Sequence, residues 1–331
     1  MDVRWLDPQR LDARDVAGAA AVFEAARVVD CPHEHGDTAA SVAANVTHGY
    51  DGDPPVVGLV RAKGGRVVGI VEVDLPRRDN RHLGWVGVTV DPLARRQGVG
   101  RSLFEAAVER VRADGRRLVV ANTFEGTAGV GLLETMGLGR VSVEVQRRQH
   151  ILDIDWERLD HDYALAERHC VEYDLVQMPG RTPEHLLDDV ARMAAAINDA
   201  PTDDYDVEDE VFTPERLRGF DDAQRVHERR VYRLVARDRR TGDLAGHTLV
   251  SVDGPRPWFG WQYDTSVLRA HRGHRLGFVL KAAMLRWLAE EEPQLRTLDT
   301  WNAASNDHMI RVNEMLGYRV VANVIGWQRH L

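Results

Sequence analysis

The stretch that decides the fold is Val88-Thr-Val-Asp-Pro-Leu-Ala-Arg-Arg-Gln-Gly-Val-Gly-Arg-Ser-Leu-Phe-Glu-Ala-Ala-Val-Glu-Arg-Val111. Valines alternate from Val86 to Val90, as they do in a half-buried strand, and the Asp-Pro pair that follows ends the strand because proline has no N–H to donate. Apolar side chains then recur at helical spacing from Leu103 to Val111. The stretch therefore predicts a strand, a loop from Arg95 to Arg101, and the start of a helix.

The loop from Arg95 to Arg101 has the composition of an anion site. Gly98 and Gly100 let the backbone approach a ligand closely, and the arginines add positive charge beside the positive end of the helix dipole. A pyrophosphate group fits these properties. For an isolated match, the alternative is a plain glycine turn with solvated arginines.

A second copy of the same pattern occurs later in the chain. Adding 177 to the numbering carries Val90 to Val267, Arg95 to Arg272 and Gly100 to Gly277, and the apolar offsets of the following helix repeat as well. A repeated strand, arginine-glycine loop and amphipathic helix predicts two homologous domains.

Both loops resemble the acetyl-coenzyme A loop of the Gcn5-related N-acetyltransferase (GNAT) superfamily, whose pattern is Gln or Arg, two residues, Gly, one residue, then Gly or Ala. The first copy matches in full, whereas the second has Arg275 in place of the first glycine. Arg275 either blocks a phosphate there or clamps it. Each copy later ends in a helix and a glycine, Gly137 and Gly317, similar to the family's Phe-Tyr-Glu-Lys-Leu-Gly-Phe segment. The chain is similar to tandem GNAT proteins of the mycothiol synthase type over nearly its full length.

The resemblance implies an α/β (α+β) fold of two tandem GNAT domains, each with a mixed, mostly antiparallel central sheet flanked by helices. We expect the N-terminal domain at residues 1–152, a charged linker at 153–170 and the C-terminal domain at 171–331. Thr182 followed by proline predicts a helix that Thr182 caps and that reaches Ile197, and Thr213 followed by proline predicts another.

Composition limits the classes of protein. The 331 residues carry a net charge of −9, which does not favour nucleic-acid binding, and no apolar run approaches the length of a membrane span. The N-terminus lacks the apolar core of a signal peptide, and two cysteines, Cys31 and Cys170, give no disulfide framework. We therefore expect a cytoplasmic protein, a monomer or a homodimer, with no nucleic-acid or membrane partner.

The resemblance implies that the cofactor is acetyl-CoA, released as coenzyme A, and that its acetyl group moves to the amine of a small molecule by direct attack in a ternary complex. The pantetheine arm would follow the strand before each loop and the pyrophosphate would rest on the loops. Asn302 and Asn306 would contact the cofactor, although helix capping by Asn302 or Ser305 is as good an explanation. The residues implied in cofactor binding, besides these asparagines, are Val88, Thr89, Val90, Arg95, Arg96, Gln97, Gly98, Val99, Gly100, Arg101, Ser266, Val267, Arg272, Gly273, His274, Arg275, Leu276 and Gly277.

Acid and base groups differ from the family pattern. Leu133 and Asn313 occupy the place of the family's usual tyrosine acid, so the acid of the second domain would be Tyr318, Tyr263 or a water. Asp264 is the candidate base or substrate anchor, with a structural carboxylate as the alternative. This richer polar set favours the C-terminal domain as catalytic and the N-terminal domain as a cofactor-binding or regulatory copy.

Two further clusters are notable. The acidic run from Asp203 to Glu210 is expected in the substrate-side loops of the second domain, where it would steer a cationic amine or simply be solvated. The loop from Cys31 to Asp37 superficially resembles a metal site, but no second cluster lies at zinc-like spacing, so we expect no metal. His33, Glu34 and His35 would instead line the acceptor pocket of the first domain.

Two rival functions remain. A non-catalytic acyl-CoA binding or sensing protein would explain the missing tyrosines and Arg275. A nucleotide-binding module would use the same loops, but no Walker lysine pattern is present.

Overall fold

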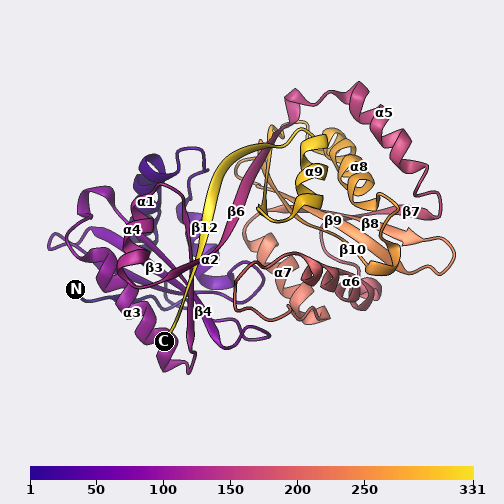
Figure 1. Ribbon diagram of the computed structural model, residues 1–331. Helices are drawn as coiled ribbons and strands as arrows, with labels where there is room; N and C mark the ends of the chain where they lie inside the picture. Colours follow the sequence, from indigo (N-terminus) through magenta and orange to yellow (C-terminus); the bar gives the residue numbers. More distant parts are fainter. The chain divides into compact units, whose positions relative to one another are not determined.

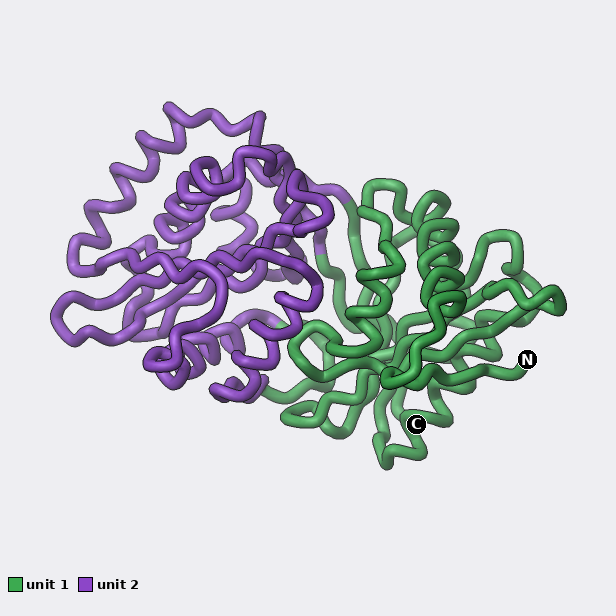
Figure 2. Tube along the Cα trace, turned by 180° about the vertical axis from the view of Figure 1, so that it is seen from behind, with its two compact units in different colours: residues 1–144, 202–209, 322–331 green, residues 145–201, 210–321 purple.

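The computed structural model describes all 331 residues and divides into two compact units (Figure 2). Unit 1 comprises residues 1–144, 202–209 and 322–331, and unit 2 comprises residues 145–201 and 210–321. Each unit is therefore built from separate stretches of chain, whereas the sequence analysis predicted contiguous ranges.

Unit 1 is a sheet with helices on both faces (Figure 1). Its strands lie in the order β1 (Arg4–Trp5), β2 (Val56–Arg61), β3 (Val67–Asp74), β4 (Leu83–Val90), β5 (Leu118–Phe124) and the C-terminal part of β12 (Arg319–His330). Its helices are α1 (Ala13–Asp30), α2 (Ala39–His48), the short 3-10 helix η1 (Pro92–Ala94), α3 (Val99–Ala113) and α4 (Ala128–Thr135).

Strand β3 explains why this part of the sequence is almost entirely apolar. Successive side chains of a strand point to opposite faces, so both faces of β3 need apolar partners. Val71 and Val73 pack in the cluster that contains Leu103 of α3, whereas Ile70 packs with Val16 of α1. Glu72 is the one charged residue within this apolar run.

The last strand of the chain completes the sheet of unit 1. β12 pairs antiparallel with β5, from Val324 opposite Phe124 to His330 opposite Leu118. The Trp327 side chain is 1% exposed and packs in the same core as α3. The C-terminal residues are thus part of the N-terminal core.

Residues 202–209 also belong to unit 1. The Tyr205 hydroxyl donates to Asn122 Oδ1 at 2.8 Å, and the backbone N–H of Glu208 donates to Asn80 Oδ1 at 2.7 Å. The expectation that the acidic run covers the substrate side of the second domain is therefore wrong for Asp203 to Asp209. Tyr205 and Val207, which sit among the acidic residues, anchor the segment on an apolar patch of β4 and β5.

Unit 2 repeats this plan. Its strands lie in the order β6 (Gly139–His150, of which residues from Val145 belong here), β11 (Thr297–Ala303), β10 (Phe259–Val267), β9 (Leu244–Val252), β8 (Arg230–Asp238) and β7 (Tyr173–Pro179). Its helices are α5 (Trp156–Glu167), α6 (Leu187–Ala194), α7 (Pro214–Val226), α8 (Leu276–Glu291) and α9 (Asp307–Met315), with the 3-10 helices η2 (Ile151–Asp153), η3 (Glu184–Leu186), η4 (Ala195–Asp199) and η5 (Arg269–His271). The stretch predicted as a linker contains α5, whose Leu159 packs in the core of unit 2.

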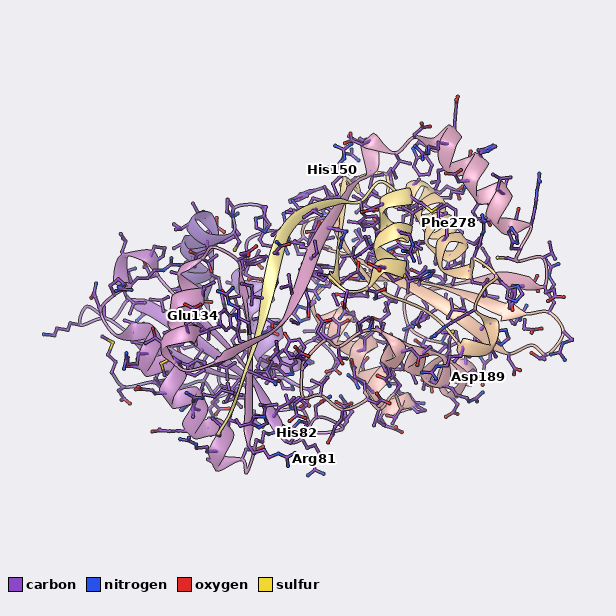
Figure 3. The ribbon with its side chains drawn as sticks, in the orientation of Figure 1. Arg81, His82, Glu134, His150, Asp189 and Phe278 are labelled. Atoms are coloured by element: carbon purple, nitrogen blue, oxygen red, sulfur yellow. The ribbon has the colours of Figure 1, made fainter.

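The mixed, mostly antiparallel sheet predicted for each domain is confirmed. β4 pairs parallel with β5, and β10 pairs parallel with β11, whereas the ladders of β2 with β3 and of β8 with β9 are antiparallel. Phe278, labelled on α8 in Figure 3, is buried in the core of unit 2. No helix has the length and apolar character needed to cross a membrane.

The helix predicted from Thr182 to Ile197 is shorter than expected. Thr182 does not cap it, because the Thr182 side chain and backbone N–H both hydrogen-bond to Asp221 of α7. A 3-10 turn without a side-chain cap precedes α6, which begins at Leu187. The second predicted start is confirmed: Thr213 caps α7 by accepting from the N–H of Arg216 at 3.2 Å.

Candidate active site

Both arginine-glycine loops take the same backbone path from strand to helix. Each has two residues with positive φ separated by one residue: Arg96 at 62° and Gly98 at 85° in unit 1, and Gly273 at 89° and Arg275 at 59° in unit 2. Glycine adopts this left-handed conformation readily, while any other residue pays about 1 kcal/mol for it. The second loop therefore keeps the backbone shape despite lacking the first glycine of the pattern, because glycine and arginine have exchanged places.

The two loops are open at the helix starts. Gly98 and Arg275 are the N-cap residues of α3 and α8, and neither helix start has a side-chain cap. A Cβ built on Gly98, Gly273 or Gly277 would meet no atom within 4 Å. The first N–H groups of both helices therefore lack a side-chain acceptor, which is the arrangement that an anion completes.

The first arginine of each loop is used to hold the loop. Arg95 donates through Nε to the carbonyl of Val90 at 3.2 Å and pairs with both carboxylate oxygens of Asp30. Arg272 repeats this with the carbonyl of Val267 at 3.0 Å and with Asp199. This leaves the exposed side chains Arg96, Arg101 and Arg275 as the cations available to a ligand.

The other predicted loop residues have structural contacts. Gln97 donates through Nε2 to the carbonyl of Leu93 at 3.2 Å, and His274 Nδ1 lies 3.2 Å from the carbonyl oxygen of His169. Val99 and Leu276, the first residues of α3 and α8, are buried and anchor the helix starts in the two cores. Gly100 packs against α4, because a Cβ at this position would lie 3.3 Å from Leu132 Cδ2.

The strand before each loop parts from its parallel neighbour. β4 pairs with β5 only as far as Trp85 opposite Val120, and β10 pairs with β11 only as far as Trp261 opposite Asp299. Beyond those residues, one edge of each strand has backbone groups without a ladder partner, and this edge is the kind that an extended ligand can pair with. The predicted cofactor residues of the strands lie in this part: Val88, Thr89 and Val90 in β4, and Ser266 and Val267 in β10.

Only the second of these strands is bulged. In unit 1, Gly87 of β4 lies opposite Glu72 of β3 with no shift of register. In unit 2, Gln262 lies opposite Val250 and Thr265 opposite Thr248, so two residues, Tyr263 and Asp264, face the single Leu249. A bulge interrupts the regular ladder of backbone hydrogen bonds and turns its side chains in a new direction.

Each unit has a carboxylate with a raised pKa at this point of the sheet. In unit 2 burial raises the pKa of Asp264, while the charges of Arg233 and Arg216 oppose the shift. In unit 1 burial, with Asp74 and Asp37 nearby, raises the pKa of Glu72 to about 8. Asn45 of α2 donates to Glu72 Oε1 at 2.8 Å.

The sequence analysis did not find Glu72. The signal was present, because Glu72 is the single charge in the run Val67-Val-Gly-Ile-Val-Glu-Val73. A carboxylate inside a doubly buried strand is costly and marks a candidate functional group.

The two predicted catalytic tyrosines lie on opposite faces of the unit 2 sheet. Tyr263 packs against Phe220 of α7 and accepts a hydrogen bond from Ser251 Oγ at 3.4 Å. Tyr318 is buried on the α8 side, in the main core of the unit, and its hydroxyl has no hydrogen-bond partner. Burial raises the pKa of both phenols.

The two predicted asparagines have different roles. Asn306 caps α9, accepting through Oδ1 from the N–H of Met309 at 3.2 Å. Asn302 Oδ1 instead accepts from Asn313 Nδ2 at 2.7 Å. Asn313, at the place of the family's tyrosine, in turn accepts from Lys281 Nζ at 2.7 Å. The sequence analysis missed Lys281.

Comparison with known proteins agrees with this geometry. The profile of the acetyltransferase (GNAT) family matches residues 24–138 and 194–318, which cover most of both units. No curated protein matches the chain.

Solved structures with the same fold cover the chain almost completely. A tandem GNAT protein from the clavulanic acid biosynthesis pathway, solved without acetyl-CoA, is 25% identical, with a TM-score of 0.80 over 99% of this chain and 98% of that one. A GCN5-related N-acetyltransferase from Sphaerobacter thermophilus is 17% identical, with a TM-score of 0.65 over 99% of this chain and 95% of that one. Another from Anabaena variabilis is 10% identical, with a TM-score of 0.54 over 99% and 72%. Together with the two family matches, these structures show that the chain is a tandem member of the GNAT acetyltransferase family.

Proposed function

We propose that unit 2 transfers the acetyl group of acetyl-CoA to the amine of a small molecule by direct attack in a ternary complex, and that unit 1 is a cofactor-binding copy. The observation that carries this proposal is the bulge at Tyr263 and Asp264. It places a carboxylate at the point where β10 parts from β11.

The cofactor would bind mainly through backbone groups. Its pyrophosphate would accept hydrogen bonds from the backbone N–H groups at the starts of α3 and α8, beside the exposed Arg96, Arg101 and Arg275. Its pantetheine arm would pair with the free edges of β4 and β10. Arg95 and Arg272 would hold the loops in shape through their aspartate partners.

The chemistry needs one base and one proton donor. Asp264 would take a proton from the attacking ammonium, and its raised pKa makes it a better base than an ordinary aspartate at neutral pH. The amine nitrogen would then bond to the thioester carbon and lose its second proton to water. The carbon–sulfur bond would break, and the thiolate would take a proton from Tyr318 or from water. Tyr263, next to Asp264 and on the α7 side, would contact the acceptor.

Unit 1 has one feature that favours a second transfer centre. Glu72 lies opposite Gly87, at the register position that Leu249 occupies opposite the bulge in unit 2, and its pKa of about 8 suits a general base. An active unit 1 would use Glu72 where unit 2 uses Asp264.

The test follows free thiol while the purified protein is mixed with acetyl-CoA and a panel of amines. We expect thiol release with at least one amine, and a loss of 10²- to 10⁴-fold in kcat for Asp264→Asn, the range for a general base. Glu290→Gln, an exposed carboxylate on α8, is the matched control and should retain full activity. Binding of acetyl-CoA without thiol release for any amine would support an acyl-CoA sensor instead. Activity lost in Glu72→Gln and kept in Asp264→Asn would move the transfer to unit 1.

A further inference from the structure

A buried lysine in unit 2 lies in a chain of side-chain hydrogen bonds that the reaction described above does not use. Lys281, on the second turn of α8, is 2% exposed. Its Nζ donates to Asn313 Oδ1 at 2.7 Å and lies 4.7 Å from the centre of the Tyr318 ring. Its flanking residues on α8, Leu280 and Ala282, belong to the apolar core.

The fold itself does not require these polar side chains. The positions of Lys281, Asn313 and Tyr318 correspond to Phe104, Leu133 and Leu138 in unit 1, and all three of those are buried in one apolar cluster. Burying an amine in place of a phenyl ring costs free energy unless its hydrogen bonds are made. Burial accordingly lowers the pKa of Lys281 to about 7. The polar set in unit 2 therefore points to a function that unit 1 does not share.

The order of donors along this series of hydrogen bonds fixes how the side-chain amides of Asn313 and Asn302 are oriented. Lys281 donates to Asn313 Oδ1, so Asn313 turns its oxygen toward Lys281 and its NH₂ toward Asn302. Asn302 must then turn its oxygen toward Asn313, which leaves its own NH₂ directed away from this chain. Each amide orientation follows from the hydrogen bond that Lys281 donates.

Asn302 lies where this direction matters. It is near the end of β11, three residues beyond Asp299, the last residue that pairs with β10. The N–H donors of Asn302 therefore belong to the stretch where the two strands have parted. An extended ligand lying along the free edge of β10 would have its amide carbonyls within this stretch.

We propose that Lys281 is a positioning residue that holds Asn313 and Asn302 so that the Asn302 amide donates to a carbonyl of the pantetheine arm. This inference rests on the proposed function, because it requires the cofactor to lie along β10. It concerns affinity for the pantetheine arm and not for the nucleotide end of the cofactor.

The test compares two probes by calorimetric titration: coenzyme A, and 3′-phosphoadenosine 5′-diphosphate, which lacks the pantetheine arm. In Lys281→Met, which replaces the amine by an apolar side chain of similar length, we expect about a tenfold weaker affinity of one site for coenzyme A, the effect of one lost hydrogen bond. Affinity for the nucleotide probe should be unchanged. Unit 1 has Phe104 at the position of Lys281, so the affinity of a site in unit 1 for coenzyme A should not change and serves as an internal reference.

Asn302→Ala is the second variant, because it removes the same donor without touching the core. It should weaken coenzyme A binding to the same extent, and the double variant should be no weaker than Asn302→Ala alone. Equal weakening of both probes in Lys281→Met, or additive losses in the double variant, would overturn the inference. If the wild-type protein transfers acetyl groups but Lys281→Met binds coenzyme A normally, the inference fails while the proposed function stands. If the wild-type protein binds neither probe, both fail.

Discussion

Replacing Trp327 by alanine is expected to destabilise unit 1 and to leave unit 2 folded. The side chain is 1% exposed, and its ring packs in the α3 core of unit 1 with the Arg140 guanidinium 5.0 Å from the ring centre. Removing a buried tryptophan costs about 3–5 kcal/mol, and the lost cation–π contact adds about 0.5–1 kcal/mol. A loss near 5 kcal/mol is comparable to the whole stability of many domains.

Hydrogen exchange followed by mass spectrometry locates this loss. Peptides from β5 and α3 should exchange faster in Trp327→Ala by about the factor that 4–5 kcal/mol implies, roughly 10³-fold, and peptides from α8 and β9 should keep their protection. Trp258→Ala is the control, since Trp258 is 41% exposed, and it should change little. Equal loss of protection in the peptides of α8 would refute the assignment of β12 to the core of unit 1. No loss in the peptides of β5 would refute it as well.

Three further changes test the site. Gly98→Ala should lower the free energy of unfolding, measured by urea titration, by about 1 kcal/mol. Nothing crowds the new Cβ, but alanine tolerates a φ of 85° poorly. A cost near zero would contradict the need for glycine at this position. Glu72 has a folded-state pKa of about 8, above its ordinary value of 4.5, so its ionisation should destabilise unit 1 as the pH rises from about 5 to 8. Over that range the Tm of the Glu72→Gln variant should fall less than the Tm of the wild-type protein. Identical Tm profiles of the two proteins would count against a buried carboxylate. Hydrogen bonds from Arg269 and Arg272 lower the pKa of Asp199 to about 2, so Asp199 should hold the second loop above about pH 4 and release it as the pH falls toward 2. Asp199→Asn should weaken coenzyme A binding at neutral pH. Unchanged affinity for coenzyme A would exclude this role of Asp199.

The local parts of the fold were predictable from the sequence because their signals are short-range. The alternation of Val86 to Val90, the proline after it and the helical spacing from Leu103 give β4, the loop and α3 almost at their observed bounds. The helix from Thr182 was mispredicted because a tertiary contact decided it. Thr182 hydrogen-bonds to Asp221 of α7 through its side chain as well as its backbone N–H, and this partner is 39 positions away.

The sheet to which the last strand, β12, belongs could not be predicted from local sequence. Trp327 and Ile325 alternate as in any buried strand, but this pattern is equally consistent with either sheet. The partner of β12 is decided by pairing with β5, about two hundred residues earlier in the chain. The acidic run shows the same limit, since Tyr205 holds it to unit 1 through a contact with Asn122.

The backbone geometry of the candidate site was the easiest part to predict, because the loops and the strands before them follow from local sequence. Asp264 was a candidate because it lies in the strand that leads to the second loop. Its position in a bulge depends on the register with β9 and cannot be read from the sequence of one strand. Lys281 was missed for a related reason. A lysine within an apolar helix is ordinarily solvated at its tip, and only the packing of α8 against α9 shows that its amine is buried.

The exchanges between the two copies show which features are constrained. Arginine and glycine trade places at the two left-handed positions of the loops, although an arginine there costs about 1 kcal/mol in each copy. A strained conformation persists only when its surroundings enforce it. Here the first arginine of each loop, Arg95 or Arg272, is held by an aspartate, Asp30 or Asp199. Both units have therefore kept the backbone conformation of the loop, while the side chains around it differ. The two units differ at the bulge of β10, which β4 lacks, and at Lys281, where unit 1 has Phe104.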